Sequence, residues 1–283
     1  MMEADLPQLR ALLAVIDHGS FEAAADHLHL TQSAVSQRIR ALESAVGQVL
    51  VRRTRPAGVT EAGRIYLRLA RQVIALGDQA RQDATGHTDR HTRLPIAVNS
   101  DSLGSWVLPA LAPFADDIAF DLHREDEAHS VALLREGTVM AAITTSGRPV
   151  QGCTAHRLGS LRYLPATARP ELFPDGATPE ALRRAPVVVF DRKDDLQDAF
   201  LRDHGVDPAA PPRHHVPASA DFATAVRLGM GWGMLPETEI HGLTVLDQHP
   251  TDVTLHWQQW SLATRALEQV GAAVRAAAAA HLR

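Results

Sequence analysis

Cysteine is nearly absent from this chain of 283 residues, and Cys153 stands alone. A single cysteine excludes an intrachain disulfide and any zinc site built on several cysteines, and it is typical of a reducing compartment. The closest histidine pairs, His27 with His29 and His214 with His215, lack carboxylates at ligand spacing. We therefore expect no metal ion and no cofactor.

Long apolar runs are also missing. No stretch approaches the roughly 20 apolar residues of a membrane-spanning helix, and the N-terminus lacks the basic stretch followed by an apolar one that marks a secretory signal. We expect a cytoplasmic protein with no membrane partner. The G-x-S-x-G, P-loop and H-E-x-x-H patterns of common enzyme classes are absent too, so an enzyme is the weaker alternative.

Positive charge is unevenly distributed along the chain, whose formal net charge is −5. Residues 1–93 contain 12 Arg and Lys against 10 Asp and Glu, a net of +2, whereas residues 94–283 contain 16 against 23, a net of −7. The N-terminal part can approach a polyanion, while the remainder repels nucleic acid and attracts cations. The length favours two or three domains over one.

Residues 20–42 predict two short helices joined by a tight turn. Ser20 can cap the first and Thr31 the second, and each helix has an apolar stripe at helical spacing. Apolar residues between Leu6 and Ile16 predict a further helix that packs across both. In a helix-turn-helix, the start of the second helix enters the major groove; an ordinary helical hairpin is the alternative. The residues expected to contact DNA there are Thr31, Gln32, Ser33, Ser36, Gln37 and Arg40.

Residues 49–60 predict two short extended arms around a Pro/Gly turn, which is typical of a wing. Arg52, Arg53 and Arg55 lie in this segment. The planar guanidinium group binds phosphate in a bidentate manner, so we expect these arginines to contact the DNA backbone beside the second helix. A solvated basic loop is the alternative.

A long helix is predicted to follow, from residue 61 to a hinge that ends near residue 92. Its apolar residues alternate at spacings of three and four, which approximates a heptad seam and favours pairing of two chains over packing within one domain. The seam residues are Ala62, Ile65, Leu69, Val73, Leu76 and Ala80.

The remaining chain alternates β-rich runs with helical patterns, which predicts an α/β arrangement. We expect two similar lobes, lobe I over about 93–163 and 264–283 and lobe II over about 164–263. The chain should cross between the lobes near residues 161–167 and return near 257–264. Ligands of open α/β sheets bind beyond the carboxyl ends of strands, so a cleft between the lobes is the expected binding site.

Acidic and hydroxyl side chains gather at these predicted strand ends. Carboxylates can bind a cationic group, while hydroxyls and helix N-termini can hold a carboxylate, and the combination fits a basic amino acid. Single residues of this kind are equally often ordinary helix caps, but their accumulation favours a site. The candidate effector-binding residues are Asp101, Ser102, Glu125, Asp126, Thr145 and Asp191.

The N-terminal pattern resembles the signature of LysR-type transcriptional regulators. The resemblance runs from Leu9 through Thr31–Ser36, Glu43, Gly47 and Arg53 to Gly63, and it departs from the usual pattern at Ser33, commonly Pro, and Val51, commonly Phe. It implies a winged helix-turn-helix over residues 1–60, a dimerising linker helix and hinge over 61–92, and an effector domain of the periplasmic-binding-protein type over 93–283.

Later segments, among them NSDSLGSWVLPAL, LGSLRYL and GMGWGMLPE, resemble the ArgP/LysG branch of this family. That resemblance implies lysine and arginine as effectors and an exporter gene for basic amino acids as the target. The expected partners are double-stranded promoter DNA, RNA polymerase and further copies of the chain in a homodimer or homotetramer. The alternatives are a regulator of another small-molecule pathway and an architectural DNA-binding protein.

Overall fold

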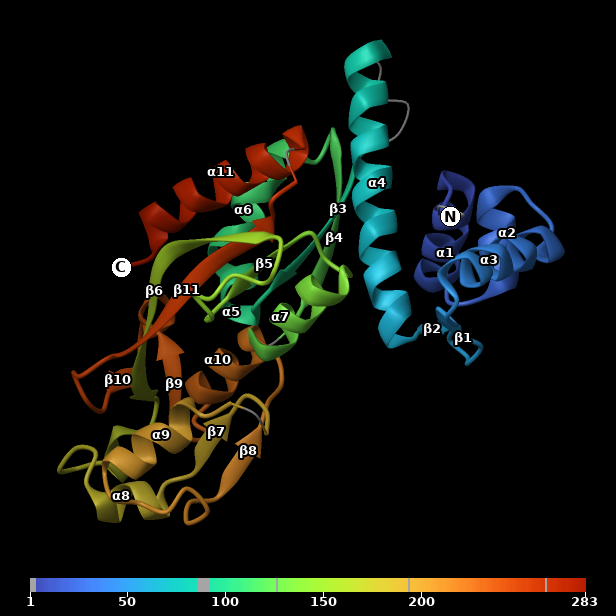
Figure 1. Ribbon diagram of the computed structural model, residues 1–283. Coiled ribbons are helices and arrows are strands. Elements are labelled where there is room, and N and C mark those ends of the chain that lie inside the picture. The colour runs from blue at the N-terminus through green and yellow to red at the C-terminus, as the bar shows by residue number, and fades with distance from the viewer. Residues whose placement is uncertain (1–3, 86–91, 126, 193, 263) are drawn as a thin grey trace.

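The computed structural model describes residues 4–85, 92–125, 127–192, 194–262 and 264–283. A small helical unit and a larger α/β unit lie on opposite sides of one long helix, α4 (Figure 1). The helical unit and α4 comprise α1 (Leu6–Asp17), α2 (Phe21–Leu28), α3 (Gln32–Val46), β1 (Val51–Arg52), β2 (Gly58–Val59) and α4 (Glu61–Thr85).

The predicted helix starts in the small unit are confirmed. The Ser20 hydroxyl accepts a hydrogen bond from the Ala23 N–H at 3.0 Å, and the Thr31 hydroxyl accepts one from the Ala34 N–H at 3.2 Å. His29 ends α2 with a left-handed backbone, φ 53°, which produces the tight turn between the caps. Leu6 differs from the expected stripe, because it is 40% exposed. The shared core of the three helices includes Leu12, Val15, Ala24, Val35, Ile39 and Leu42.

The predicted wing is a short antiparallel hairpin in which Val51 pairs with Val59. The Glu43 carboxylate fixes it to α3 by accepting hydrogen bonds from the N–H groups of Leu50 at 2.9 Å and Val51 at 3.2 Å. At Gly63, a β-carbon would lie 2.0 Å from the Leu50 carbonyl oxygen. Only glycine therefore allows α4 to pass this close to the hairpin.

One sheet runs through the α/β unit in the order β10-β6-β11-β5-β3-β4, and β9 also pairs with β6. β3 is parallel to β4 and β5, and the other pairs are antiparallel. A separate parallel pair joins β7 to β8. The strands are β3 (Thr92–Val98), β4 (Ile118–Arg124), β5 (Ala141–Thr144), β6 (Cys153–Thr167), β7 (Val187–Val189), β8 (Arg213–His215), β9 (Gly233–Pro236), β10 (Thr244–Val245) and β11 (Thr251–Trp260).

Helices cover the sheet and flank the strands of lobe II (Figure 1). The last helix, α11, packs with α6 against the sheet, while α7 packs against β3 and β5 and reaches α4 (Figure 1). The helices are α5 (Ser100–Ser102), continued by a π-helical turn (Leu103–Val107) and α6 (Leu108–Leu111), then α7 (Glu127–Glu136), α8 (Pro179–Arg184), α9 (Leu196–Asp203), α10 (Ser219–Arg227) and α11 (Arg265–His281). Among the described residues, 3₁₀ turns lie at Ala112–Phe114, Pro170–Leu172 and Glu237–Glu239.

Strand β6 runs through both lobes and β11 begins where the chain returns to lobe I, and both strands are longer than the predicted crossings. β6 begins at Cys153 and β11 at Thr251, and they pair along ten positions with a register shift at Leu255/His256. Short apolar runs within these strands predicted only the segments where the chain changes lobe. The paired part lies in lobe I, so the chain returns there at Thr251 and not near residues 257–264 as predicted. The alternating exposure of β6 gives a weaker sequence signal in this part.

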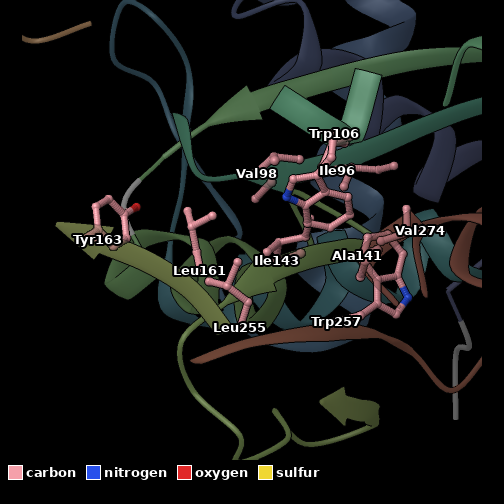
Figure 2. Close-up of a cluster of buried hydrophobic side chains, with 14 of the residues drawn as sticks. Ile96, Val98, Trp106, Ala141, Ile143, Leu161, Tyr163, Leu255, Trp257 and Val274 are labelled. Atoms are coloured by element: carbon pink, nitrogen blue, oxygen red, sulfur yellow. The ribbon is translucent and has the colours of Figure 1, made fainter. Parts of the chain in front are cut away.

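The core of the α/β unit is rich in tryptophan. Figure 2 shows Trp106 among Ile96 and Val98 and Trp257 beside Val274, all on elements of lobe I. Trp106, Trp257 and Trp260 are at most 1% exposed. Because one apolar cluster includes these residues together with lobe II side chains such as Val187 and Trp232, the lobes are packed on each other.

Helix α4 has two distinct faces. Leu67 and Ala70 are buried, whereas Ile65, Leu69 and Leu76 of the predicted seam are 69%, 40% and 45% exposed in the single chain. The seam therefore does not pack inside its own domain at these three positions.

A polar cluster connects the helical unit with the α/β unit. Asp17, at the end of α1, pairs with Arg71 of α4 at 2.6 Å and with Arg93 of β3 at 3.1 Å. Arg93 also pairs with Asp121 of β4 at 2.7 Å, and Arg71 donates to the Gly137 carbonyl oxygen. We call Asp17, Arg71, Arg93 and Asp121 the Asp17 cluster. It joins three parts of the chain that are distant in sequence.

Candidate DNA interface and interlobe cavity

The first turns of α3 present their polar side chains away from the core of the small unit. Gln32, Ser33, Gln37 and Arg40 are exposed and Ser36 is half-buried, whereas Val35 and Ile39 on the opposite face are buried. This is the orientation in which a recognition helix can place amide and hydroxyl groups against base edges.

Thr31 has a structural task at the start of α3. Its hydroxyl caps the helix and also shares a hydrogen bond with the Ser33 hydroxyl at 2.9 Å. Both residues are exposed. The cap fixes the direction in which the helix begins.

The wing places three exposed guanidinium groups beside α3. Arg52 ends β1, and Arg53 and Arg55 lie in the turn that leads to β2. The guanidinium carbon of Arg53 lies 5.1 Å from the centroid of the Phe21 ring on α2, a cation–π distance. This contact holds the charge of Arg53 close to the helix pair.

A cavity of about 640 Å³ opens between the lobes. The carboxyl ends of β3, β4 and β5 contribute one wall, and the loop before α9, the start of α10 and the end of β9 contribute the other. Of the predicted effector-binding residues, Asp101, Glu125, Thr145 and Asp191 line this cavity. Asp126 lies outside the described residues.

Ser102 differs from the prediction. It is 0% exposed and does not line the cavity. Asp101 and Ser102 are consecutive helical residues about 100° apart around the axis, so they cannot both face the same wall. Position at a strand end therefore predicts the segment that lines the cavity but not which of its side chains face it.

Carboxylates dominate the charge of the cavity. Two of them already have cationic partners on the same lobe, Asp195 with Arg202 and Glu239 with Arg227, the latter at 3.0 Å. The cavity-lining acids are Asp101, Glu125, Asp191, Asp194, Asp195 and Glu239. Their surplus gives the cavity a negative field that attracts a cationic ligand.

Asp194 is the acid whose ionisation the surroundings disfavour most clearly. Burial raises its pKa above the ordinary aspartate value, and the neighbouring charge of Asp191 acts in the same direction. Hydrogen bonds from the N–H groups of Leu196 at 3.1 Å and Phe190 at 3.2 Å oppose the shift without cancelling it. A cation placed beside Asp194 would favour its charged form.

Asp101 connects the two lobes. One of its carboxylate oxygens accepts a hydrogen bond from the Tyr163 hydroxyl on β6, and the other accepts one from the Ser219 hydroxyl on α10 at 2.7 Å. Its position between these hydroxyls makes Asp101 part of the contact that sets the distance between the lobes.

Sequence reasoning missed several lining residues. Arg124 is the last residue of β4, directly before Glu125, and the strand-end rule could have found it had it been applied to basic side chains. Tyr163 lies within a crossing strand, and Glu239 lies in an irregular segment with no periodic signal.

Within the described part of the chain, no helix has both the length and the apolar character that crossing a membrane requires. The same residues contain no group of three or more His, Cys, Asp or Glu side chains placed to share a metal ion.

Comparison with known proteins gives matches over both units. Residues 6–64 match the bacterial regulatory helix-turn-helix protein, lysR family, and residues 87–282 match the LysR substrate binding domain. The HTH-type transcriptional regulator LysG of Mycobacterium tuberculosis (strain ATCC 25618 / H37Rv) is 43% identical over 287 residues, which cover 98% of this chain and 94% of that protein. The lysine export transcriptional regulatory protein LysG of Corynebacterium glutamicum is 40% identical over 289 residues and 98% of each chain.

Solved structures agree with these matches. The crystal structure of ArgP from Mycobacterium tuberculosis superposes with a TM-score of 0.87 at 42% identity, covering 98% of each chain. Full-length LysG from Corynebacterium glutamicum with the bound effector Arg superposes with a TM-score of 0.80 at 38% identity, covering 99% of each chain.

Proposed function

Because the chain belongs to the LysR family of bacterial transcriptional regulators, and is thus a DNA-binding regulator and not an enzyme, we propose that it senses arginine or lysine. The observation that carries the proposal is the cavity itself, whose lining acids outnumber its cationic side chains. The Arg bound as effector in LysG from Corynebacterium glutamicum supports the same ligand class.

The cationic end of the ligand side chain binds among the lining acids. Asp195 and Glu239 pair with arginines of their own lobe. We expect Glu125, Asp191 and Asp194 to bind the cationic group, because all three line the cavity, with Thr145 at the same wall. Asp126, which follows Glu125 in sequence, is proposed to belong to the same group. The target gene encodes an exporter of basic amino acids. The name of the Corynebacterium glutamicum relative, lysine export transcriptional regulatory protein LysG, supports this target class.

Operator DNA is read by α3 and the wing. Gln32, Ser33, Ser36, Gln37 and Arg40 contact base edges or nearby phosphates, and Thr31 fixes the helix start. The phosphate contacts come from Arg52, Arg53 and Arg55. Two chains pair through the exposed seam of α4, so that two recognition helices reach two half-sites. The dimer, or a tetramer of two dimers, changes DNA bending or its contact with RNA polymerase when ligand alters the lobes.

Calorimetric titration of the full chain tests the ligand. Arginine and lysine should bind, whereas citrulline, which has nearly the shape of arginine but no side-chain charge, should bind at least about 10-fold more weakly. Glu125→Gln and Asp126→Ala should weaken arginine binding, while Glu180→Gln, 73% exposed on α8 outside the cavity, serves as the control. Equal affinity for arginine and citrulline would contradict the proposal.

Footprinting tests the regulatory role. The chain should protect a discrete site upstream of its own gene or of a neighbouring transporter gene, and arginine or lysine should change the protection pattern. If no discrete site is protected under either condition, the assignment of this target class fails.

A further inference from the structure

Arg124 is unlike every other charged residue of the cavity. It is the only basic side chain among the described residues that line the cavity. It is exposed at the end of β4, and none of the described residues pairs with its guanidinium group. Its positive charge repels the cationic side chain of the ligand, so Arg124 must have another role in the cavity.

An α-amino acid effector brings a carboxylate into this acidic cavity. Coulomb repulsion from the lining acids opposes its binding, so the carboxylate needs a strong donor. A guanidinium group offers two parallel N–H bonds that match the geometry of a carboxylate. Arg124 has the required charge and lies on the cavity wall.

Asn99 provides an independent sign of a ligand at the same place. Asn99 lines the cavity and is 8% exposed, and its buried Oδ1 atom has no hydrogen-bond partner among the described residues. Buried acceptors are normally satisfied, and a bound ammonium group would supply the missing donor. Because β3 and β4 are parallel, with Val98 opposite Arg124 and the Glu125 N–H bonded to the Val98 carbonyl at 3.2 Å, Asn99 and Arg124 lie at neighbouring strand ends.

We propose that Arg124 binds the α-carboxylate of the effector and that Asn99 accepts a hydrogen bond from its α-ammonium group. The inference rests on the proposed function and adds a specificity to it. The cavity distinguishes a basic amino acid from the amine that carries the same side chain, so it rejects agmatine in favour of arginine and cadaverine in favour of lysine.

Calorimetry on the full chain with arginine and agmatine as probes tests this proposal. The wild type should bind arginine about 10- to 100-fold more tightly than agmatine. Arg124→Met should remove most of this preference, because it weakens the binding of arginine but not of agmatine, which has no carboxylate for Arg124 to bind. Asn99→Ala should weaken both ligands, because agmatine keeps the amine. Arg157→Met, at an exposed arginine of β6 outside the cavity, is the matched control.

The outcomes separate this inference from the function on which it rests. A wild type that binds arginine and agmatine equally, or an Arg124→Met variant that loses both equally or neither, overturns the role of Arg124 and leaves basic amino acid sensing intact. If Ser219→Ala loses arginine binding while Arg124→Met binds arginine as the wild type does, the α-carboxylate of the ligand lies at the start of α10 instead. A wild type that binds no basic amino acid overturns both proposals. Unchanged melting temperatures verify that the variants are folded.

Discussion

At the scale of single residues, the half-buried carboxyl group of Asp194 should make the affinity for the ligand depend on pH. Its pKa lies above the reference value of 3.8, so it takes up a proton before ordinary surface aspartates as the pH falls. Bound arginine favours the charged form of Asp194. The affinity for arginine should therefore increase as the pH rises through the pKa of Asp194 and decrease at lower pH. Titration calorimetry across the acidic range measures this dependence.

Asp194→Asn should lower arginine affinity about 10-fold at neutral pH and flatten the acidic part of the profile. Asp203→Asn, at an exposed aspartate of α9 outside the cavity, should change neither. An Asp194→Asn variant with the wild-type profile would show that Asp194 does not sense the ligand charge.

Substitutions at two DNA-facing residues should affect DNA binding in different ways. Gln37→Ala should cost about 1–3 kcal/mol of discrimination between operator and mismatched DNA. Arg53→Ala should weaken binding to all sequences and reduce the salt slope by about one. Gel-shift titrations at several salt concentrations, on operator and on scrambled DNA, distinguish the two effects. The same salt slope in Arg53→Ala and the wild type would remove Arg53 from the phosphate contacts.

The residue types of the cavity could be predicted from sequence, but the direction of individual side chains could not. Polar residues at strand ends identified Asp101, Glu125 and Asp191 as lining residues. The same reasoning included the buried Ser102, because helical side-chain directions depend on where the helix begins. It also omitted Tyr163, whose hydroxyl meets a carboxylate 62 positions earlier in the chain, a contact that no local pattern indicates.

At the scale of elements, the exposed seam of α4 should govern chain pairing. Ile65→Glu with Leu69→Glu places two charges on the apolar seam, and it should shift the chain from dimer or tetramer to monomer. Leu228 is 77% exposed and lies outside α4, so Leu228→Glu tests whether any added surface charge has this effect. Light scattering at micromolar concentration measures the mass. A double variant with unchanged mass would place the interface elsewhere.

Two glycines of α4 should respond oppositely to alanine. Gly63→Ala forces a β-carbon against the Leu50 carbonyl and should destabilise the wing and helical unit by about 3 kcal/mol or more. In Gly77→Ala the added β-carbon has no atom within 4 Å, so this variant should stabilise the helix by about 0.5–1 kcal/mol. Chemical unfolding followed by circular dichroism compares them. Equal effects would mean that helix propensity, and not the close approach at Gly63, sets both results.

The helices were easier to predict than the sheet. Local signals defined α2 and α3, since the caps at Ser20 and Thr31 and the apolar spacing all lie within a few residues. The pairing of β6 with β11 joins residues that are 88 positions apart at Tyr163 and Thr251 and 107 apart at Cys153 and Trp260. Such pairing depends on the whole fold, so no local pattern could reveal where these strands begin.

At the scale of the whole molecule, the Asp17 cluster should stabilise the contact between the DNA-binding unit and the α/β unit. The side chains of Asp17 and Arg71 are 14% and 12% exposed, so Asp17→Ala leaves a largely buried guanidinium group without its carboxylate. We expect a loss of about 2 kcal/mol or more in unfolding free energy. We also expect a smaller effect of arginine on DNA affinity, measured by fluorescence anisotropy with labelled operator.

The ion pair between Arg64 and Glu61, whose acid is 87% exposed, provides the comparison for this variant. Glu61→Ala should change stability by well under about 1 kcal/mol and leave the response to arginine as it is. An Asp17→Ala protein whose DNA affinity still responds fully to arginine would show that the two units communicate by another route.

Strand β6 runs through both lobes and limits how the α/β unit can move. It pairs with β11 in lobe I and with β9 in lobe II, and paired strands keep a spacing of about 4.8 Å, so they can change their twist but cannot slide apart. The rotation of one lobe against the other is then small, and it is centred near Tyr163, where β6 passes from its pairing with β11 to its pairing with β9. In the proposed dimer, two-fold symmetry gives the partner the same rotation in the opposite sense. The angle between the two half-sites therefore changes by twice the rotation of one chain, and DNA curvature is a more sensitive measure of ligand than the shape of either protomer.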